Sequence, residues 1–236
     1  MTRDASVLGD VVARDRRSDR PALRAPGDPD RAYDYRRLAT TAWKTGNHLR
    51  YLGVRAGSRV GVPAARHPEP VLVLLGAALV GAVVRLDPPR SFDGRAVVAP
   101  TDRVRRFDLP PGSRRVGYGA ASDDPSVVHF ERDVWRENPT EPPESVAPDD
   151  PVVATAATER THADLLAAAA GVAADLRTDD VVAVREPLGD PDVLAAGLVA
   201  PLLAGAAVLF PDGEAVGTVA VTRGRAPEDR VRRPGT

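Results

Sequence analysis

The first stretch of the chain with a clear hydrophobic pattern is a helix-period segment that begins after residue 34. Its apolar positions recur with the spacing of one helix face: Leu38, Ala42, Leu49 and Leu52. Asp34 is suited to cap the start of this helix, and Gly53 is suited to end it. Unbroken apolar runs follow, and they predict a strand at 59–62, a helix at 68–80 and a strand at 82–86.

The same order of elements returns later in the chain. Thr161, with Asp164 three residues on, resembles a capping box at the start of a helix over 162–176. The second repeat continues as a strand at 180–184, a helix from Pro191 to Gly205 that is capped by Asp190, and a strand at 206–210. Helices that alternate with continuous apolar strands are typical of parallel sheets. The sequence therefore predicts an α/β fold of two helix–strand–helix–strand units, with mainly parallel strands covered by helices.

The stretch between the two repeats is less regular. Strands are expected at 96–99, 115–118 and 126–130, followed by a linker rich in proline and acidic residues at 138–151. We expect a first α/β unit with a strand-rich extension at 1–146, a second α/β unit at 147–212 and a mostly mobile tail at 213–236. One strand, at 217–222, is expected at the beginning of that tail.

Composition narrows the function classes. The 236 residues carry a net charge of −1 and include no cysteine, which excludes disulfides, zinc ribbons and thiol catalysis. We expect no nucleic-acid partner, because the positive and negative charges are balanced. We expect no membrane span, because the apolar runs are short. We expect a cytoplasmic location, because the first 20 residues lack the apolar core of a signal peptide. Lys44 is the single lysine, and the other 31 basic residues are arginines. We attribute this bias to a GC-rich genome, so abundant arginine is not in itself a sign of phosphate binding.

Several short motifs occur in an order that resembles one family. They are Tyr33-Asp34-Tyr35-Arg36-Arg37-Leu38, Leu52-Gly53-Val54, Gly57-Ser58-Arg59-Val60, Gly81-Ala82-Val83-Val84, Leu86-Asp87-Pro88 and Thr161-His162-Ala163-Asp164-Leu165-Leu166. This order is similar to the N-terminal half of the AMP-forming acyl-CoA synthetases, an adenylate-forming, AMP-binding superfamily. The resemblance covers most of 30–90 and 147–212. It implies the fold of the N-terminal subdomains of such a ligase.

The resemblance also implies a phosphate-binding loop before residue 161, and here the sequence departs from the family. Relatives carry a loop rich in Thr, Ser and Gly that ends in Pro-Lys-Gly, whereas residues 154–160 contain no glycine and no lysine. The remnants that could contact a nucleotide are Thr155, Thr158, Arg160, Thr161 and His162. For the loop residues a polar turn is the more common role, and for His162 a place at the helix start is the more common one. No catalytic residue and no metal ligand can be assigned.

The downstream motifs that the resemblance implies are also missing, including the adenine and metal motif and the C-terminal catalytic lysine. The four histidines have no metal-binding spacing, and no GxSxG nucleophile motif occurs. We expect a truncated acyl-CoA synthetase-like protein without adenylation activity and without a cofactor. It would bind a ligand or a protein partner, which is either a full-length relative or a separate C-terminal half. One alternative is half of a split AMP-forming acid-CoA ligase, completed by another chain and using ATP, Mg²⁺ and CoA. A second alternative is a non-catalytic interaction module.

Overall fold

The computed structural model describes residues 5–25 and 32–235, which fold into two compact units. Unit 1 combines residues 1–39, 65–68 and 162–236, and unit 2 combines residues 40–64 and 69–161. The units therefore do not follow one another along the chain. The domain boundaries near residues 146 and 212 that composition suggests stay a prediction.

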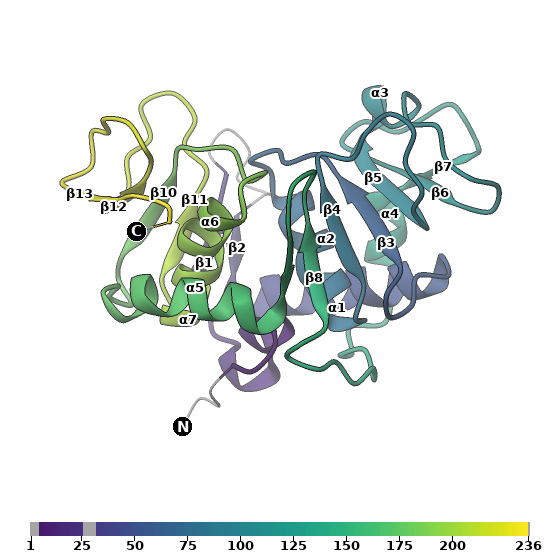
Figure 1. The fold of residues 1–236 in the computed structure, drawn as a ribbon. Helices are drawn as coiled ribbons and strands as arrows, with labels where there is room; N and C mark the ends of the chain where they lie inside the picture. Colours follow the sequence, from purple (N-terminus) through teal and green to yellow (C-terminus); the bar gives the residue numbers. More distant parts are fainter. Residues whose placement is uncertain (1–4, 26–31, 236) are drawn as a thin grey trace. The chain divides into compact units, whose positions relative to one another are not determined.

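Unit 2 is built on a seven-stranded sheet with the order β7-β6-β5-β3-β4-β8-β9 (Figure 1). Its strands are β3 (Arg59–Val62), β4 (Val83–Leu86), β5 (Ala96–Pro100), β6 (Arg114–Tyr118), β7 (Val127–His129), β8 (Pro151–Ala154) and β9 (Glu159–Thr161). Neighbouring strands run parallel except β8 and β9, which form an antiparallel hairpin. The parallel strands carry nearly continuous Val and Ala, as expected for strands that are buried on both faces.

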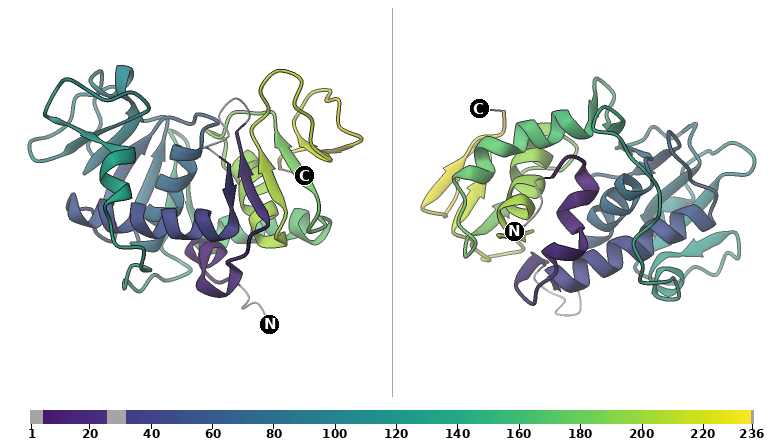
Figure 2. Two further views of the ribbon diagram at one scale, coloured as in Figure 1. Left: turned by 180° about the vertical axis from the view of Figure 1, so that it is seen from behind. Right: turned by 90° about the horizontal axis from the view of Figure 1, so that it is seen from below.

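Four helices accompany this sheet. They are α1 (Tyr35–Tyr51), which begins in unit 1, α2 (Pro68–Leu79), α3 (Thr101–Val104) and α4 (Phe130–Trp135). The main-chain N–H of Arg37 donates to Asp34 Oδ1 at 2.6 Å, so the predicted cap of α1 is confirmed. The predicted apolar face is also buried. The two views of Figure 2 show α1 and α2 close together, and their backbones meet at Gly46 and Gly76.

Unit 1 is built on a six-stranded sheet with the order β13-β12-β10-β11-β1-β2. Its strands are β1 (Pro21–Arg24), β2 (Tyr33–Asp34), β10 (Val181–Val184), β11 (Ala207–Leu209), β12 (Val219–Val221) and β13 (Arg230–Arg232). The pairings are parallel except that of β1 with β2. The predicted fold class, α/β with mainly parallel strands, is confirmed. The sequence does not predict β1, because only Ala22 and Leu23 of its four residues are apolar and buried, between Pro21 and Arg24.

The helical segments of unit 1 are η1 (Leu8–Val12), η2 (Arg14–Arg16), α5 (His162–Ala174), α6 (Pro191–Leu194), η4 (Ala195–Val199) and α7 (Ala200–Ala204). The segment η4 packs on β10, and α5 packs in turn on η4 and α7. The single helix expected from Pro191 to Gly205 is wrong in detail, because η4 is a π-helical stretch. Pro201 explains it: proline lacks an N–H and clashes with the carbonyl four residues earlier, which favours a wider turn at that point. Gly205 ends α7 in a left-handed conformation, as predicted.

The stretch after Thr222, which composition marks as mobile, contains the additional strand β13. Two of its arginines anchor it. Arg230 Nη1 contacts Asp180 Oδ1 at 2.8 Å, and Arg232 Nη2 contacts Asp175 Oδ2 at 2.7 Å. Sequence alone could not predict these pairs, because the partners lie about fifty residues apart.

The region 126–151 also differs in detail from the expectation. The strand ends at His129, whose ring Nδ1 accepts from the N–H of Arg132 at 3.2 Å and so caps α4. The proline-rich stretch at 138–151 belongs to unit 2, and its first part lies along α1. Asn47 Nδ2 donates to the carbonyl oxygens of Asn138 and Thr140, at 3.1 and 2.8 Å. Among the described residues, no helix combines the length and apolar character needed to cross a bilayer.

Candidate functional site

The predicted phosphate-loop remnant forms the tip of the β8–β9 hairpin. The N–H of Thr155 donates to the carbonyl oxygen of Thr158 at 2.8 Å and closes the turn. Thr155 Oγ1 accepts from the N–H groups of Ala157 and Thr158, at 3.2 and 3.0 Å. The two threonine hydroxyls also contact each other, at 3.3 Å. A short loop begins and ends with threonine here, and both side chains serve to close it.

The hydrogen bonds that close the turn occupy main-chain N–H groups, which are the groups that a phosphate site needs. A phosphate-binding loop presents several main-chain N–H groups to one concave surface, usually with glycines that let the backbone approach the anion. In this turn the N–H groups of Thr155, Ala157 and Thr158 already have acceptors inside the turn. Glu159 follows directly and pairs with Arg59, with 3.4 Å between Oε2 and Nη2. The turn is therefore followed directly by a carboxylate, which is paired with an arginine of β3.

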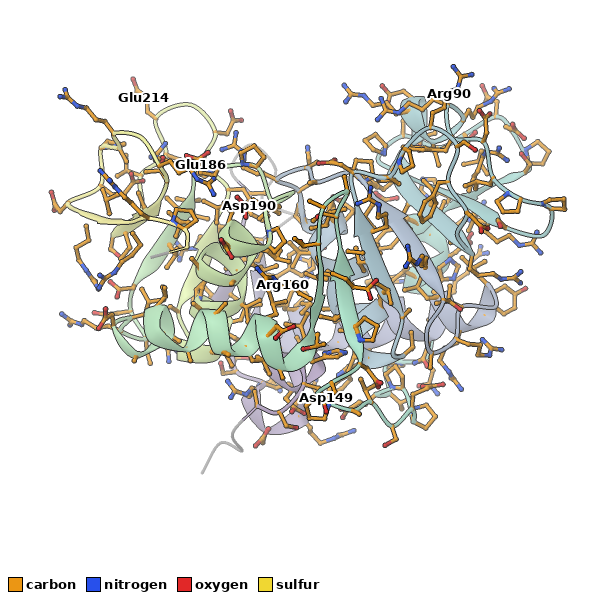
Figure 3. The ribbon with its side chains drawn as sticks, viewed as in Figure 1. Arg90, Asp149, Arg160, Glu186, Asp190 and Glu214 are labelled. Carbon is orange, nitrogen blue, oxygen red and sulfur yellow. The ribbon has the colours of Figure 1, made fainter. Side chains whose placement is uncertain are left out.

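The structure brings some of the predicted residues together and leaves another apart. Thr155 and Thr158 are in contact, and Arg160 lies on the same hairpin, opposite Val153 in the strand register (Figure 3). Thr161 ends β9 opposite Pro151. Nucleotide contact by these four residues stays a prediction.

His162 begins α5 in unit 1 and has no exposed surface. Its ring Nδ1 accepts from the main-chain N–H of Leu8 at 2.9 Å. The side chain thus joins α5 to η1 across more than 150 residues of sequence. Sequence reasoning placed this histidine at a helix start but could not identify its partner, which is a main-chain group.

The other titratable groups do not assemble a metal site. Among the described residues, no group of three or more His, Asp or Glu side chains has the geometry to hold a metal ion. His48 lies in unit 2 with its Nδ1 3.5 Å from Glu137 Oε1. Burial lowers the pKa of His48, although Glu137 and Asp133 act to raise it. A neutral imidazole at this position suits a structural role.

A polar cluster that the sequence did not indicate lies at the carboxyl ends of β10 and β12. β10 has β11 on one side and β12 on the other, which makes it a topological switch point, where open α/β sheets commonly bind ligands. Glu186 Oε1 accepts from Thr222 Oγ1 at 3.0 Å and from the N–H of Arg223 at 2.8 Å. Asp190 pairs with the guanidinium of Arg223 (Figure 3).

These carboxylates are stabilised by internal donors. Hydrogen bonds from Arg223 N–H and Thr222 lower the pKa of Glu186. Burial acts to raise the pKa of Asp190, but hydrogen bonds from the N–H of Asp192 and from Arg223 outweigh it, and the pKa falls. Only Asp190 could be anticipated from sequence, as the cap before Pro191. The contact of Glu186 with Thr222 depends on the pairing of β10 with β12, which has no local sequence pattern.

Residues 10–92 match the model of a family described as AMP-binding enzyme. None of the curated proteins matches the sequence. Among solved structures, the chain is similar to an anthranilate CoA ligase, AuaEII, in complex with anthranoyl-AMP. The identity is 20%, the match covers 92% of this chain and 49% of that one, and the TM-score is 0.76.

Two further structures show the same likeness. A benzoate CoA ligase from Burkholderia xenovorans LB400 is 20% identical over 91% of this chain and 50% of its own, with a TM-score of 0.73. The N-terminal domain of FACL13 from Mycobacterium tuberculosis is 18% identical over 92% of this chain and 62% of its own, with a TM-score of 0.68. The chain has the fold of the N-terminal part of such ligases and spans about half the length of the first two. The resemblance predicted from the sequence motifs is confirmed.

Proposed function

We propose that this chain is an acyl-CoA synthetase-like domain that forms no adenylate by itself. It acts instead by binding a ligand or a protein partner. The observation that carries the proposal is the closed turn at 155–158, in which the N–H groups of Thr155, Ala157 and Thr158 are bonded within the turn. Adenylate formation requires donors and cations placed around a reacting phosphate. Loss of one such donor typically costs about 3–4 kcal/mol of transition-state stabilisation.

The position of the single lysine supports the same proposal. Lys44 Nζ donates to the carbonyl oxygen of Trp135 at 2.7 Å and lies 5.0 Å from the centre of the Trp135 ring. It is therefore held on α1, next to α4. The cations on or beside the hairpin in the strand register are arginines: Arg160 on β9, Arg85 of β4, which lies opposite Ala154, and Arg59 of β3, which pairs with Glu159. The chain's single lysine is therefore held away from the turn.

The test is ATP–pyrophosphate exchange with the full chain, Mg²⁺ and a panel of acids that includes benzoate, anthranilate and fatty acids. We expect exchange no faster than in a blank without protein. The matched variants are Thr155→Ala, in the turn, and Thr140→Ala, outside it. Exchange by the native chain that Thr155→Ala abolishes and Thr140→Ala preserves would overturn the proposal.

A second candidate is half of a split AMP-forming acid-CoA ligase, and the specific observation in its favour is coverage. The chain matches AuaEII over 92% of its own length but over only 49% of the ligase. A second chain would then have to bring the lysine, the metal ligand and the adenine site. The test is to co-purify this chain with the product of a neighbouring gene that carries those motifs. ATP–pyrophosphate exchange by the two chains together, but by neither chain separately, supports the split ligase. If the two chains do not associate, or if they associate without exchange activity, the split ligase is rejected.

A further inference from the structure

Two large aromatic side chains stand out of the surface of unit 2. Within the described part of the chain, Trp135 is 79% exposed and Tyr51 is 81% exposed. Trp135 ends α4, which lies next to α1 in both views of Figure 2. Lys44 of α1 donates from Nζ to the carbonyl oxygen of Trp135 at 2.7 Å, and Nζ lies 5.0 Å from the centre of its ring. Trp135 is therefore fixed beside α1 while most of its surface faces solvent.

A surface hollow of about 610 Å³ lies further along the same side of α1. Its lining includes Asn47, Tyr51, Arg55, Glu137, Glu141 and Pro143. Asn47, about one helical turn beyond Lys44, donates to the carbonyl oxygens of residues 138 and 140 and so fixes the segment after α4 to α1. Pockets of about 300–1,000 Å³ accept drug-sized molecules, so the hollow has room for an aromatic side chain.

The lining of the hollow suits an aromatic ring. The Tyr51 ring stacks on the buried His48 ring, with 6.4 Å between the centroids, and is thereby supported from the protein side. Arg55 Nη1 donates to the carbonyl oxygens of Arg50 and Val54, both at 2.7 Å, which orient the guanidinium without cancelling its charge. Aromatic rings pack favourably on other rings and on guanidinium groups, and tryptophan is the best partner for a cation.

The surface around Trp135 is rich in cations. Arg132 and Arg136 of this surface are 57% and 72% exposed, and Lys44 adds a third positive charge. Asp133 is the carboxylate that these arginines share, at 2.7 Å from Arg132 Nε and 3.9 Å from Arg136 Nη1. One carboxylate cannot balance three cations, so the surroundings of Trp135 are positive.

The hollow carries the opposite balance. Arg50 pairs with Glu144, so these two charges cancel. Glu137 and Glu141 then face Arg55 as the other charged groups of the lining. A projecting ring with positive surroundings and a receiving hollow with excess negative charge thus lie side by side on one surface.

We propose that this surface binds a second copy of the chain across a two-fold axis, with Trp135 of each copy in the hollow of the other. A two-fold contact uses the same patch on both copies, so the patch must contain both a projection and its matching hollow. The positive surroundings of Trp135 then meet the negative hollow twice. Exposed tryptophan, tyrosine and arginine are also the residues that dominate binding energy at interfaces. The proposal goes beyond the binding role proposed above, and the presence or absence of adenylation does not affect it.

Sedimentation equilibrium of the full chain, from about 1 to 500 µM, tests the association. Because the patch is small, we expect a weak dimer with a dissociation constant of roughly 10–100 µM. Trp43 has no exposed surface, so Trp135 is the tryptophan whose emission should shift to the blue and become protected from acrylamide as the dimer forms. A chain that stays monomeric at 500 µM would overturn the proposal, whatever else the surface binds.

Variants locate the contact. Trp135→Ala should weaken dimerisation at least about tenfold, and it leaves the main-chain acceptor of Lys44 in place. Val216→Ala is the control, because Val216 is 51% exposed in unit 1 and does not line the hollow, and we expect no change. Each variant is first checked for an unchanged melting temperature, and Tyr51→Ala replaces Trp135→Ala if the latter folds badly. No loss in the Trp135 or Tyr51 variant, or an equal loss in Val216→Ala, would reject the contact.

An exchange of charges tests the pairing itself. Glu141→Arg places positive charge in the hollow, against the positive surroundings of Trp135, and should weaken dimerisation about tenfold. Adding Arg136→Glu to that variant lowers the opposing positive charge and should recover at least about threefold. General stickiness predicts no such recovery. A double variant as weak as Glu141→Arg would contradict the two-fold pairing.

Discussion

The crossing of α1 and α2 gives a sharp test of the packing in unit 2. A Cβ added at Gly76 would lie 2.8 Å from the main-chain nitrogen of Gly46 and 2.9 Å from Thr45 Cβ. Real Cβ atoms essentially never come that close to other heavy atoms. The first of these neighbours is backbone, which cannot rotate away as a flexible side chain can. Gly76→Ala must therefore push the two helices apart.

The sign of the effect follows from two opposing magnitudes. Alanine is favoured over glycine inside a helix by about 1 kcal/mol, which would stabilise the variant. Overpacking a close contact typically costs about 1–3 kcal/mol, and a clash with backbone belongs at the upper end. We expect a net loss of about 2 kcal/mol in the free energy of unfolding. For a protein of this size that lowers the melting temperature by about 4–8 °C.

Gly171 provides the matched control. It lies in α5, it is exposed, and nothing stands within 4 Å of an added Cβ. Gly171→Ala should therefore show only the helix preference and stabilise by about 0.5–1 kcal/mol. The stability of both variants is measured by urea unfolding followed by circular dichroism. If the two units unfold in separate transitions, the effect of Gly76→Ala is read from the transition of unit 2 and that of Gly171→Ala from the transition of unit 1. A Gly76→Ala variant as stable as the native chain would refute the close crossing.

Three other substitutions test the interior. Trp43→Ala removes a fully buried side chain and should cost about 3–5 kcal/mol in urea unfolding. Glu228→Gln breaks the buried pair with Arg185 and should cost about 2 kcal/mol or more at neutral pH. Burial acts to raise the pKa of Glu228, but the hydrogen bond and charge of Arg185 and the hydrogen bonds from the main-chain N–H groups of Gly217 and Glu228 together outweigh it. The pKa therefore falls below 4.5, so this stability is complete above that pH and is lost as the pH drops. The variant should therefore lose less stability on acidification, and an unchanged acid profile would contradict this. Tyr35→Phe removes the bond to Ala206 and should lower stability by about 1 kcal/mol, measured in the same way.

The elements with strong local patterns were predictable. The apolar face and Asp34 cap of α1, the run of β3, α2 and β4, and the glycine stop at Gly205 all follow from periodicity and backbone preference within a few residues. Parallel pairing followed as well, because unbroken apolar strands alternate with helices. Such features need only neighbours in sequence.

The features that sequence missed depend on distant partners. β13 is anchored by Asp180 and Asp175, and η1 is joined to His162 through the N–H of Leu8. The π-helical stretch before Pro201 reflects a clash inside an otherwise normal helical pattern. None of these contacts produces a periodic pattern of apolar and polar residues in the sequence.

The candidate site was predictable only in part. The missing glycine and lysine are visible in residues 154–160, so the loss of a phosphate loop could be expected. The hydrogen bonds of Thr155 to Ala157 and Thr158 could not, because a threonine hydroxyl in a loop can equally point to solvent or to a ligand. The hollow beside Tyr51 was also missed, because Asn47 and Asn138 meet only in the folded chain.

The interleaved order of the two units has a consequence for synthesis on the ribosome. Unit 2 uses residues between 40 and 161, whereas the sheet of unit 1 pairs Leu23 with Val208. β1 can pair with its neighbour β2 early, but it must stay without its parallel partner β11 while about 185 further residues are added. Because domains fold as their residues emerge, unit 2 can complete its sheet first, and β1 depends on protection from premature association until β11 arrives.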